Sequence, residues 1–354
     1  MDEILDHPLC GLSRQDQQRL KVLASDLDAL GTFPEEAVDI IVRNKHFHLF
    51  VPTQRGGLDY SLVKGMRIIE TYSRIEGNLG WIVQIGAGGG VFSAYLPEVV
   101  SDRFLGQPDQ VIAGSDFVGG EARSDRDGYQ VTGEWGYASG SLHATAFTGN
   151  VRIVDGPEEG QIRAIIVPAK EVDIVPNWKA MGMRATDSHS FRMNQVRVPR
   201  LHSFVIRQDQ LLVRNKILNL PFLVYARALF MPVLTGIGYE YIQLTEHILS
   251  SRNITGDNQF EKTWNHLRET WKDCRHVLFR MAERLGEDST SGQPFADGED
   301  EFGQTCIRIT SRLINAIDQV HRFTGMKGIL MNEPVNVAYR NIKTAAAHVL
   351  LRPA

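Results

Sequence analysis

Tyr137 and Ser139 are the two residues of this sequence whose types and spacing best suit the binding of a flat ligand. They lie in Gly133–Ala144 (GEWGYASGSLHA), which follows Asp127–Thr132, an alternating run typical of a strand after a turn. Side chains two residues apart on a strand point to the same side. We therefore expect the aromatic ring and the hydroxyl to contact one flat cofactor together. For either residue alone, the alternative is a solvent-facing strand end with a Ser-Gly turn.

A second signature lies in Trp178–Ser188 (WKAMGMRATDS) and runs through a strand pattern to Pro199. Together the two stretches resemble the β-domain of the acyl-CoA dehydrogenase superfamily, and more closely its branch of two-component flavin monooxygenases. The resemblance covers nearly the whole chain. Its other motifs are Val51–Gly57 (VPTQRGG), Gly80-Trp81 with Pro97 sixteen residues on, and Tyr339–Thr344 (YRNIKT) before His348.

The resemblance implies a flavin site assembled from several segments. Tyr137 and Ser139 match the family's aromatic and hydroxyl pair at the central flavin ring, and Ser115 matches a residue at the pyrimidine edge. Arg252 matches an arginine that reaches a flavin phosphate across a subunit interface, a role that suits the paired donors of a guanidinium. Two alternatives stay open: an ordinary Gly-Ser turn at Ser115, and a helix-dipole complement at Arg252.

Two histidines and a glycine complete the predicted site. His348 is similar to a monooxygenase histidine that faces flavin C4a, although a lone histidine on an Ala-rich helix is usually unremarkable. His143 stands where this branch often has His-Ala, and it is expected to line the substrate pocket or to order the loop. Phenol-hydroxylating members carry a substrate-facing histidine eight residues after the tryptophan matched by Trp81, where this chain has Gly89. The missing side chain leaves room for a bulkier substrate, or marks a drifted paralogue.

The function that the resemblance implies is a flavin-dependent monooxygenase or hydroxylase. Such an enzyme receives reduced flavin (FMNH2 or FADH2) from a separate flavin reductase. O2 adds at flavin C4a to give a hydroperoxide, which transfers one oxygen to a small organic substrate. Because water promotes its decay to H2O2, a dry cavity is expected. Ser139 would hydrogen-bond the flavin, and His348 would assist protonation or stabilise the peroxide.

Two other functions are compatible with the same fold. An acyl-CoA dehydrogenase requires a glutamate base, which the family places either after the C-terminal Arg-Asp pair or early in the long helix that ends at the arginine. This chain has no acid after Arg340-Asn341 and none in Tyr225–Arg227, which leaves only Glu240 and Glu246 as substitutes. A non-catalytic paralogue is the third possibility. Gly89 favours it, whereas the flavin-site residues disfavour it.

Composition bounds these functions. The 354 residues are too many for one ordinary core, and 43% hydrophobic with 23% charged residues is normal for a globular protein. A formal net charge of -4 without basic runs argues against nucleic acid. The N-terminus has no apolar signal core and no later run is expected to reach membrane-spanning length, so no membrane partner is expected. Three scattered cysteines fit neither a disulfide framework nor a metal site, and predict a cytoplasmic protein.

Periodicity predicts a mainly α protein with a central β-domain, the three-domain order of the acyl-CoA dehydrogenase fold. We expect an N-terminal helical domain (1–110), a β-barrel or sandwich (111–204) and a C-terminal four-helix bundle (205–354). Its long apolar helices favour a homotetramer. The glycine tract 86–90 requires tertiary packing or a close ligand if it is helical. The elements expected are helices at 13–30, from 34, 62–75, 217–251, 260–285, 302–323 and 337–351, with a flexible linker at 286–301.

Overall fold

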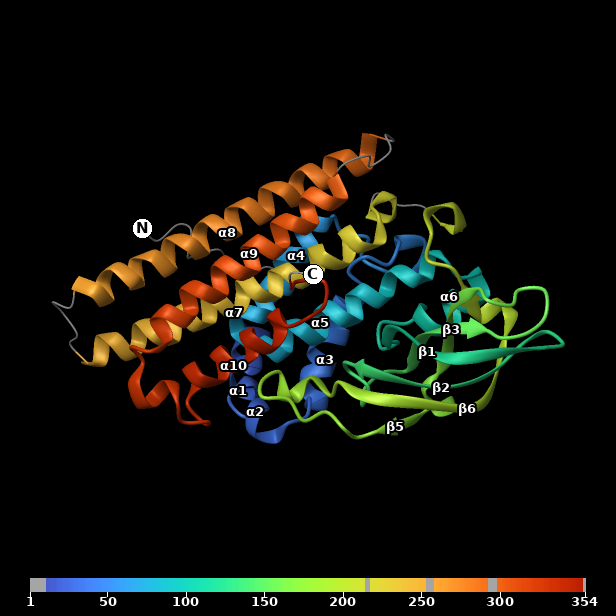
Figure 1. Cartoon of the computed structure of the whole chain (residues 1–354), viewed down its shortest axis with the longest axis horizontal. Helices are drawn as coiled ribbons and strands as arrows, with labels where there is room; N and C mark the ends of the chain where they lie inside the picture. The colour runs from blue at the N-terminus through green and yellow to red at the C-terminus, as the bar shows by residue number, and fades with distance from the viewer. Residues whose placement is uncertain (1–10, 214–216, 253–257, 292–297, 353–354) are drawn as a thin grey trace.

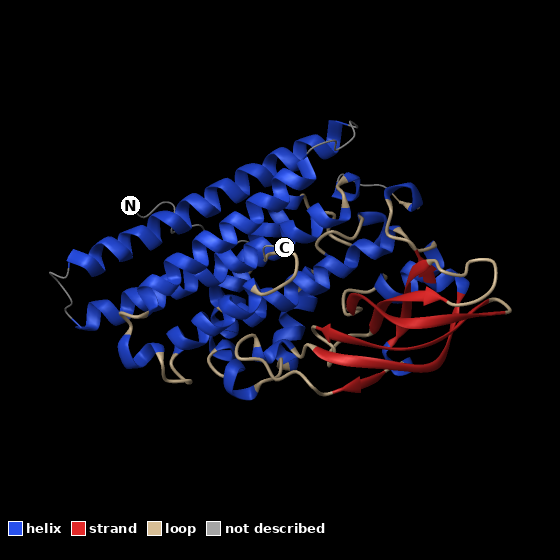
Figure 2. Cartoon of the chain, viewed as in Figure 1, coloured by secondary structure: helices blue, strands red, loops and turns tan. Residues whose placement is uncertain are grey.

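Helices, a sheet and further helices follow one another along the chain, as the periodicity predicts (Figures 1 and 2). The computed structural model describes residues 11–213, 217–252, 258–291 and 298–352. The helices before the sheet are α1 (Arg14–Ala24), α2 (Leu27–Leu30), α3 (Glu35–Arg43), α4 (Leu62–Ile75), α5 (Gly77–Gly89) and α6 (Glu98–Leu105). Those after it are α7 (Phe222–Arg252), α8 (Asn258–Ser291), α9 (Gly298–His321) and α10 (Pro334–Ala346).

Local signals define the first helices well. The Ser13 hydroxyl accepts the N–H of Asp16 at 3.0 Å and caps α1, and Pro34 precedes α3. Helix α4 has the predicted bounds, and it packs against α7 of the C-terminal bundle. Buried residues of both helical regions form one hydrophobic cluster, so the two regions share a core. The division at residues 110 and 204 stays a prediction.

The glycine tract is helical, and close packing explains how. A Cβ on Gly86 would lie 2.2 Å from Cδ1 of Phe47, and one on Gly80 would lie 1.7 Å from Oγ of Ser73. Neighbouring side chains therefore occupy the space above these glycines. Helix α5 forms against its propensity because its glycines let these side chains come close.

The strands form one seven-stranded mixed sheet in the order β5-β6-β2-β1-β3-β4-β7. Its strands are β1 (Ile112–Asp125), β2 (Gly128–Ala138), β3 (Ala146–Ile153), β4 (Ile162–Pro168), β5 (Asp173–Val175), β6 (His189–Pro199) and β7 (Ser203–Phe204). The outer strands β5 and β7 do not pair with each other, so the central β-domain is one open sheet. Its core centres on Trp135, whose ring stacks on Phe191 at 5.0 Å between centroids.

The C-terminal helices pack around α7, which contacts α4, α5, α8, α9 and α10 (Figure 1). The expected linker at 286–301 is too long, because α8 continues to Ser291 and α9 begins at Gly298; residues 292–297 lie outside the described residues. Helix α10 ends at Ala346, earlier than expected, so His348 follows the helix instead of lying on it.

One described segment, Phe222–Ser250 of α7, is long and apolar enough to cross a membrane. The expectation that no run reaches this length is therefore wrong. The burial of α7 accounts for its apolar composition, since 72% of the apolar window is buried inside the protein.

Substitutions in the glycine tract test the packing of α5. Gly86→Ala should destabilise the fold by about 1–3 kcal/mol, because its methyl group would overlap the Phe47 ring. Gly88→Ala is the matched control, since its Cβ would meet only Leu229 at 3.6 Å and Gln84 at 3.9 Å. Alanine favours a helix by roughly 1 kcal/mol over glycine, so this control should be at least as stable as the wild type. Urea denaturation measures both, and equal unfolding free energies would contradict the packing argument.

Candidate functional site

Trp81 of α5 brings the two predicted catalytic residues, Ser139 and His348, to one place. Its indole Nε1–H donates to Ser139 Oγ at 2.9 Å. Its ring lies edge-on to the His348 ring, with centroids 5.9 Å apart. Phe230 of α7 completes the group, stacked on His348 at 4.0 Å and tilted against Trp81 at 5.2 Å between centroids. Segments distant in sequence thus meet around one indole.

A line of hydroxyl groups fixes the proton of Ser139. Thr186 donates to the carbonyl of Met183 at 2.8 Å, so its oxygen accepts from Ser188 at 2.7 Å. The Ser188 oxygen then accepts from Ser139 at 2.6 Å. A hydroxyl has one proton and two lone pairs, and Trp81 already occupies one lone pair of Ser139. Ser139 therefore retains a single lone pair and offers a ligand an acceptor, not a donor.

His348 presents a neutral imidazole with one donor. The backbone N–H of Leu350 donates to its Nδ1 at 3.3 Å, which assigns the ring proton to Nε2. Burial lowers the pKa of His348 to about 4, against a smaller opposing effect of Asp116. At neutral pH the residue is thus an uncharged N–H donor between two aromatic rings.

Tyr137 does not share a face with Ser139, so that expectation is wrong. Tyr137 is 80% exposed, whereas Ser139 is 4% exposed. The β2–β6 register shifts between Trp135 and Ala138, and Tyr137 has a left-handed φ of 63°. This irregularity breaks the alternation of the strand. The Tyr137 ring lies outside, edge-on to Trp178 at 6.5 Å between centroids, where a flat ligand has access to it.

Ser115 and Arg252, which were predicted to contact the pyrimidine edge and a phosphate of the flavin, have fewer described contacts that support these roles. Ser115 lies in β1 beside a shift in the β1–β3 register, and its hydroxyl accepts the N–H of Phe117 at 3.5 Å. This local contact favours the turn interpretation. Arg252 is the last residue of α7, and its side chain lies outside the described part. The tetramer and the contact of Arg252 with a phosphate stay predictions.

The substrate-pocket residues do not enclose free space. A Cβ on Gly89 would lie 3.2 Å from Cβ of Ile112, so the expected extra room is wrong because β1 fills it. The half-buried ring of His143 lies 5.7 Å from Phe33 and 6.1 Å from Phe47 between centroids. Burial lowers its pKa to about 4, and its buried Nδ1 has no partner among the described residues. These contacts favour an ordering role in the loop.

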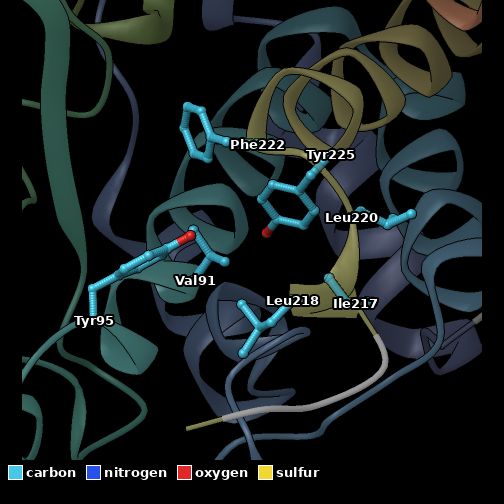
Figure 3. A pocket seen from close by; sticks show the side chains of 7 residues that line it. All are labelled: Val91, Tyr95, Ile217, Leu218, Leu220, Phe222 and Tyr225. Atoms are coloured by element: carbon cyan, nitrogen blue, oxygen red, sulfur yellow. The ribbon is translucent and has the colours of Figure 1, made fainter. Parts of the chain in front are cut away.

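A small hollow lies between the segment that follows the glycine tract and the residues at the start of α7 (Figure 3). Figure 3 shows the phenol oxygens of Tyr95 and Tyr225 directed toward the space between them. Tyr225 donates to the carbonyl of Ala87 at 3.3 Å. None of the predicted site residues is among its lining residues, which are Val91, Tyr95, Ile217, Leu218, Leu220, Phe222 and Tyr225.

Neither substitute base contacts the Trp81 group in the described part of the chain. Glu246 is exposed on α7. The carboxyl Oε2 of Glu240 is buried without a hydrogen-bond partner, and burial together with the nearby charge of Glu76 raises its pKa well above the usual range. Sequence reasoning missed Phe230 and the roles of Thr186 and Ser188. The last two lie within the Trp178–Ser188 motif, but only coordinates reveal the direction of their hydrogen bonds.

The group fits a flavin by its chemistry. An acceptor at Ser139 and a donor at His348 are the groups that the polar edges of a flat ring system require. The Trp81–Phe230–His348 cluster supplies apolar walls. The described residues contain no group of three or more His, Cys, Asp or Glu side chains suited to a metal ion.

Comparisons with known proteins show what this chain is similar to in sequence and in fold. Residues 242–353 match the family described as acyl-CoA dehydrogenase, C-terminal domain. The indole-3-acetate monooxygenase of Acinetobacter baumannii is 26% identical over 67% of this chain, which spans 65% of that relative. HsaA, the oxygenase subunit of a flavin-dependent monooxygenase of Mycobacterium tuberculosis, is 27% identical over 93% of this chain and 88% of its own length.

The fold has a solved counterpart. XiaF from Streptomyces sp., in complex with FADH2 and glycerol, superposes with a TM-score of 0.86 at 20% identity, covering 96% of this chain and 91% of that one. The predicted acyl-CoA dehydrogenase-like fold is thereby confirmed, and the family match itself covers residues 242–353.

The left-handed Tyr137 predicts a measurable backbone cost. Tyr137→Gly should be about 1 kcal/mol more stable than Tyr137→Ala, because only glycine adopts a positive φ without steric penalty. Both variants lack the ring, so their difference isolates the backbone. Urea denaturation of the pair gives this difference. Indistinguishable stabilities would show that the backbone here is unstrained.

Proposed function

We propose that this protein, which has the acyl-CoA dehydrogenase fold and C-terminal domain, is a flavin-dependent monooxygenase of a two-component system. A separate reductase supplies reduced flavin, FMNH2 or FADH2. One atom of O2 enters a small organic substrate and the other leaves as water, while the reduced flavin provides the two electrons. The observation that carries this proposal is that Trp81 contacts both Ser139 and His348.

The direction of the hydroxyl line supports the reduced form of the cofactor. Reduced flavin carries an N–H on its central ring where oxidised flavin carries a bare nitrogen. Ser139 already uses its one proton in the hydrogen bond to Ser188. It can therefore accept a hydrogen bond from the N–H of reduced flavin, but it cannot donate one to the bare nitrogen of oxidised flavin. An acceptor facing an acceptor loses a hydrogen bond and pays for desolvation. Reduced flavin is therefore the better ligand.

His348 and its neighbours suit a water-poor reaction. The neutral imidazole offers the Nε2–H donor to an oxygen atom of a ligand, and its lowered pKa keeps it uncharged at neutral pH. The Trp81 and Phe230 rings pack against His348 on either side and shield part of it from solvent. Hydrogen bonds in such surroundings are stronger than in water.

Dehydrogenation of acyl-CoA has less support. The two positions of the family base hold no carboxylate, and Glu240 makes no contact with the Trp81 group in the described part of the chain. A non-catalytic paralogue does not require the hydroxyl line. It would bind neither redox form of flavin selectively.

Flavin titration under anaerobic conditions tests the hydroxyl line. The wild type should bind reduced flavin more tightly than oxidised flavin. Ser139→Ala should weaken reduced-flavin binding roughly fivefold, the loss of about 1 kcal/mol for one hydrogen bond. Ser188→Ala removes the acceptor of the Ser139 proton, so the Ser139 hydroxyl can donate to a ligand. The affinity for oxidised flavin should therefore rise relative to the affinity for reduced flavin. Ser141→Ala is the control, since its hydroxyl donates to the Asp187 carbonyl outside the line.

The outcomes separate the three functions. No affinity of the wild type for reduced flavin would favour the non-catalytic paralogue. An unchanged ratio of affinities in Ser188→Ala, with reduced flavin still preferred, would contradict the role given to the hydroxyl line.

Rapid mixing with O2 tests His348. When the complex with reduced flavin meets O2, His348→Ala should release more H2O2 than the wild type, because a donor in a water-poor site is lost. His276→Ala, on the exposed face of α8, is the control. Acyl-CoA esters should leave the absorbance of oxidised flavin unchanged. Bleaching by an acyl-CoA, or equal H2O2 yields from all three proteins, would count against the monooxygenase.

A further inference from the structure

Glu76, at the start of α5, receives four hydrogen bonds. Its Oε2 accepts the backbone N–H of Asn78 at 2.7 Å and that of Leu79 at 3.4 Å, which caps the helix. Its Oε1 accepts the amide nitrogens of Asn78 at 2.7 Å and Asn341 at 2.6 Å. Glu76 is 4% exposed, and the two asparagines are fully buried. The carboxylate thus joins α5 to α10 inside the protein.

Backbone groups fix the orientation of both amides. The N–H of Ala185 donates to Asn78 Oδ1 at 3.0 Å, and the N–H of Met183 donates to Asn341 Oδ1 at 2.6 Å. Each amide must therefore turn its NH2 group toward Glu76. All four partners of the carboxyl group are donors, and only a carboxylate accepts from four donors. An added proton, or an amide nitrogen in place of an oxygen, would face a donor.

Keeping a carboxylate here is costly. Burial raises the pKa of Glu76 to about 7, although its four hydrogen bonds act in the opposite direction. Across from it on α7, Glu240 is a second buried carboxyl group whose pKa is raised well above the usual range. The four hydrogen bonds offset the burial of the charge, and breaking them leaves buried groups without partners.

The segment that this network holds is the one that orients Ser139. Met183 and Ala185 begin the stretch Met183–Ser188, whose two hydroxyls form the line to Ser139. Met183 and Asp187 have left-handed φ angles of 53° and 46°, which external contacts must maintain. The carbonyl of Thr186 also accepts the N–H of Gly140, next to Ser139. Two amides on one carboxylate therefore hold a strained segment against the strand end that carries Ser139.

We propose that Glu76 is a positioning residue that sets the Ser139 hydroxyl for flavin through Asn78, Asn341 and the segment Met183–Ser188. It acts at a distance and touches no ligand. The proposal rests on the proposed function, because flavin at Ser139 is what the positioning serves. The proposal requires a hydrogen-bond acceptor at the centre of the network. If the acceptor at residue 76 is lost, an acceptor supplied by a neighbouring residue should restore the network.

The test compares three variants by anaerobic flavin titration. Glu76→Gln places an NH2 group against the two amide donors, so we expect reduced-flavin affinity to fall at least fivefold and the preference for reduced flavin to shrink. Adding Asn341→Asp supplies an acceptor for the new NH2 group while its other oxygen still accepts from Met183. This double variant should recover most of the affinity. Glu240→Gln is the control, since its carboxyl Oε2 has no partner to lose, and it should bind as the wild type does.

Each outcome decides the proposal. Unchanged affinity in folded Glu76→Gln overturns it, and so does a double variant that binds no better than the single one. If Glu76→Gln does not fold, the double variant decides alone: wild-type affinity supports the proposal, and weak binding or failure to fold overturns it. Failure of the wild type to bind reduced flavin is a separate result, which would overturn the proposed function instead.

Discussion

The hydrogen bond from Trp81 to Ser139 is the contact on which the site depends, because it fixes the distance between a helix and the sheet. That distance requires α5 to pack closely along its length. Gly80, beside Trp81, lies against Ser73, and Gly89 at the other end lies against Ile112 of β1. A helix with larger side chains at these positions would hold the indole away from Ser139. The low helix propensity of this segment is thus a condition of the site, offset by tertiary packing.

The polar groups around this contact form two connected networks. In one, the Glu76 carboxylate accepts four hydrogen bonds; in the other, the hydroxyl line ends at the carbonyl of Met183. Such buried networks stabilise one arrangement only when every member is paired. Within the described residues, the last lone pair of Ser139 and the Nε2–H of His348 remain for a ligand. One is an acceptor and the other a donor, and both are oriented before any ligand arrives.

Sequence reasoning predicted what depends on local pattern. The amphipathic spacing of 62–75 gave the bounds of α4, and the family motifs identified Ser139 and His348, which the structure brings together. It failed where geometry is not local. Nothing in a tyrosine marks a left-handed residue, so the break in β2 at Tyr137 was not visible. Ile112, which belongs to β1 and not to the helix of Gly89, fills the space over Gly89, and the local sequence does not reveal this contact. The role of Glu76 depends on its hydrogen bond with Asn341, which lies 265 residues away in the sequence.

The distribution of residues with positive φ bears on whether the region around Ser139 binds a ligand or is only structural. Six described residues other than glycine have positive φ, and three of them, Tyr137, Met183 and Asp187, lie in the two segments joined at Ser139. Each such residue costs of order 1–3 kcal/mol, and packing alone gives no reason to concentrate that cost. A stable paralogue without a ligand would be better served by glycine or asparagine at these positions. The concentration of strain beside an oriented acceptor therefore favours a protein in which this region still binds its cofactor.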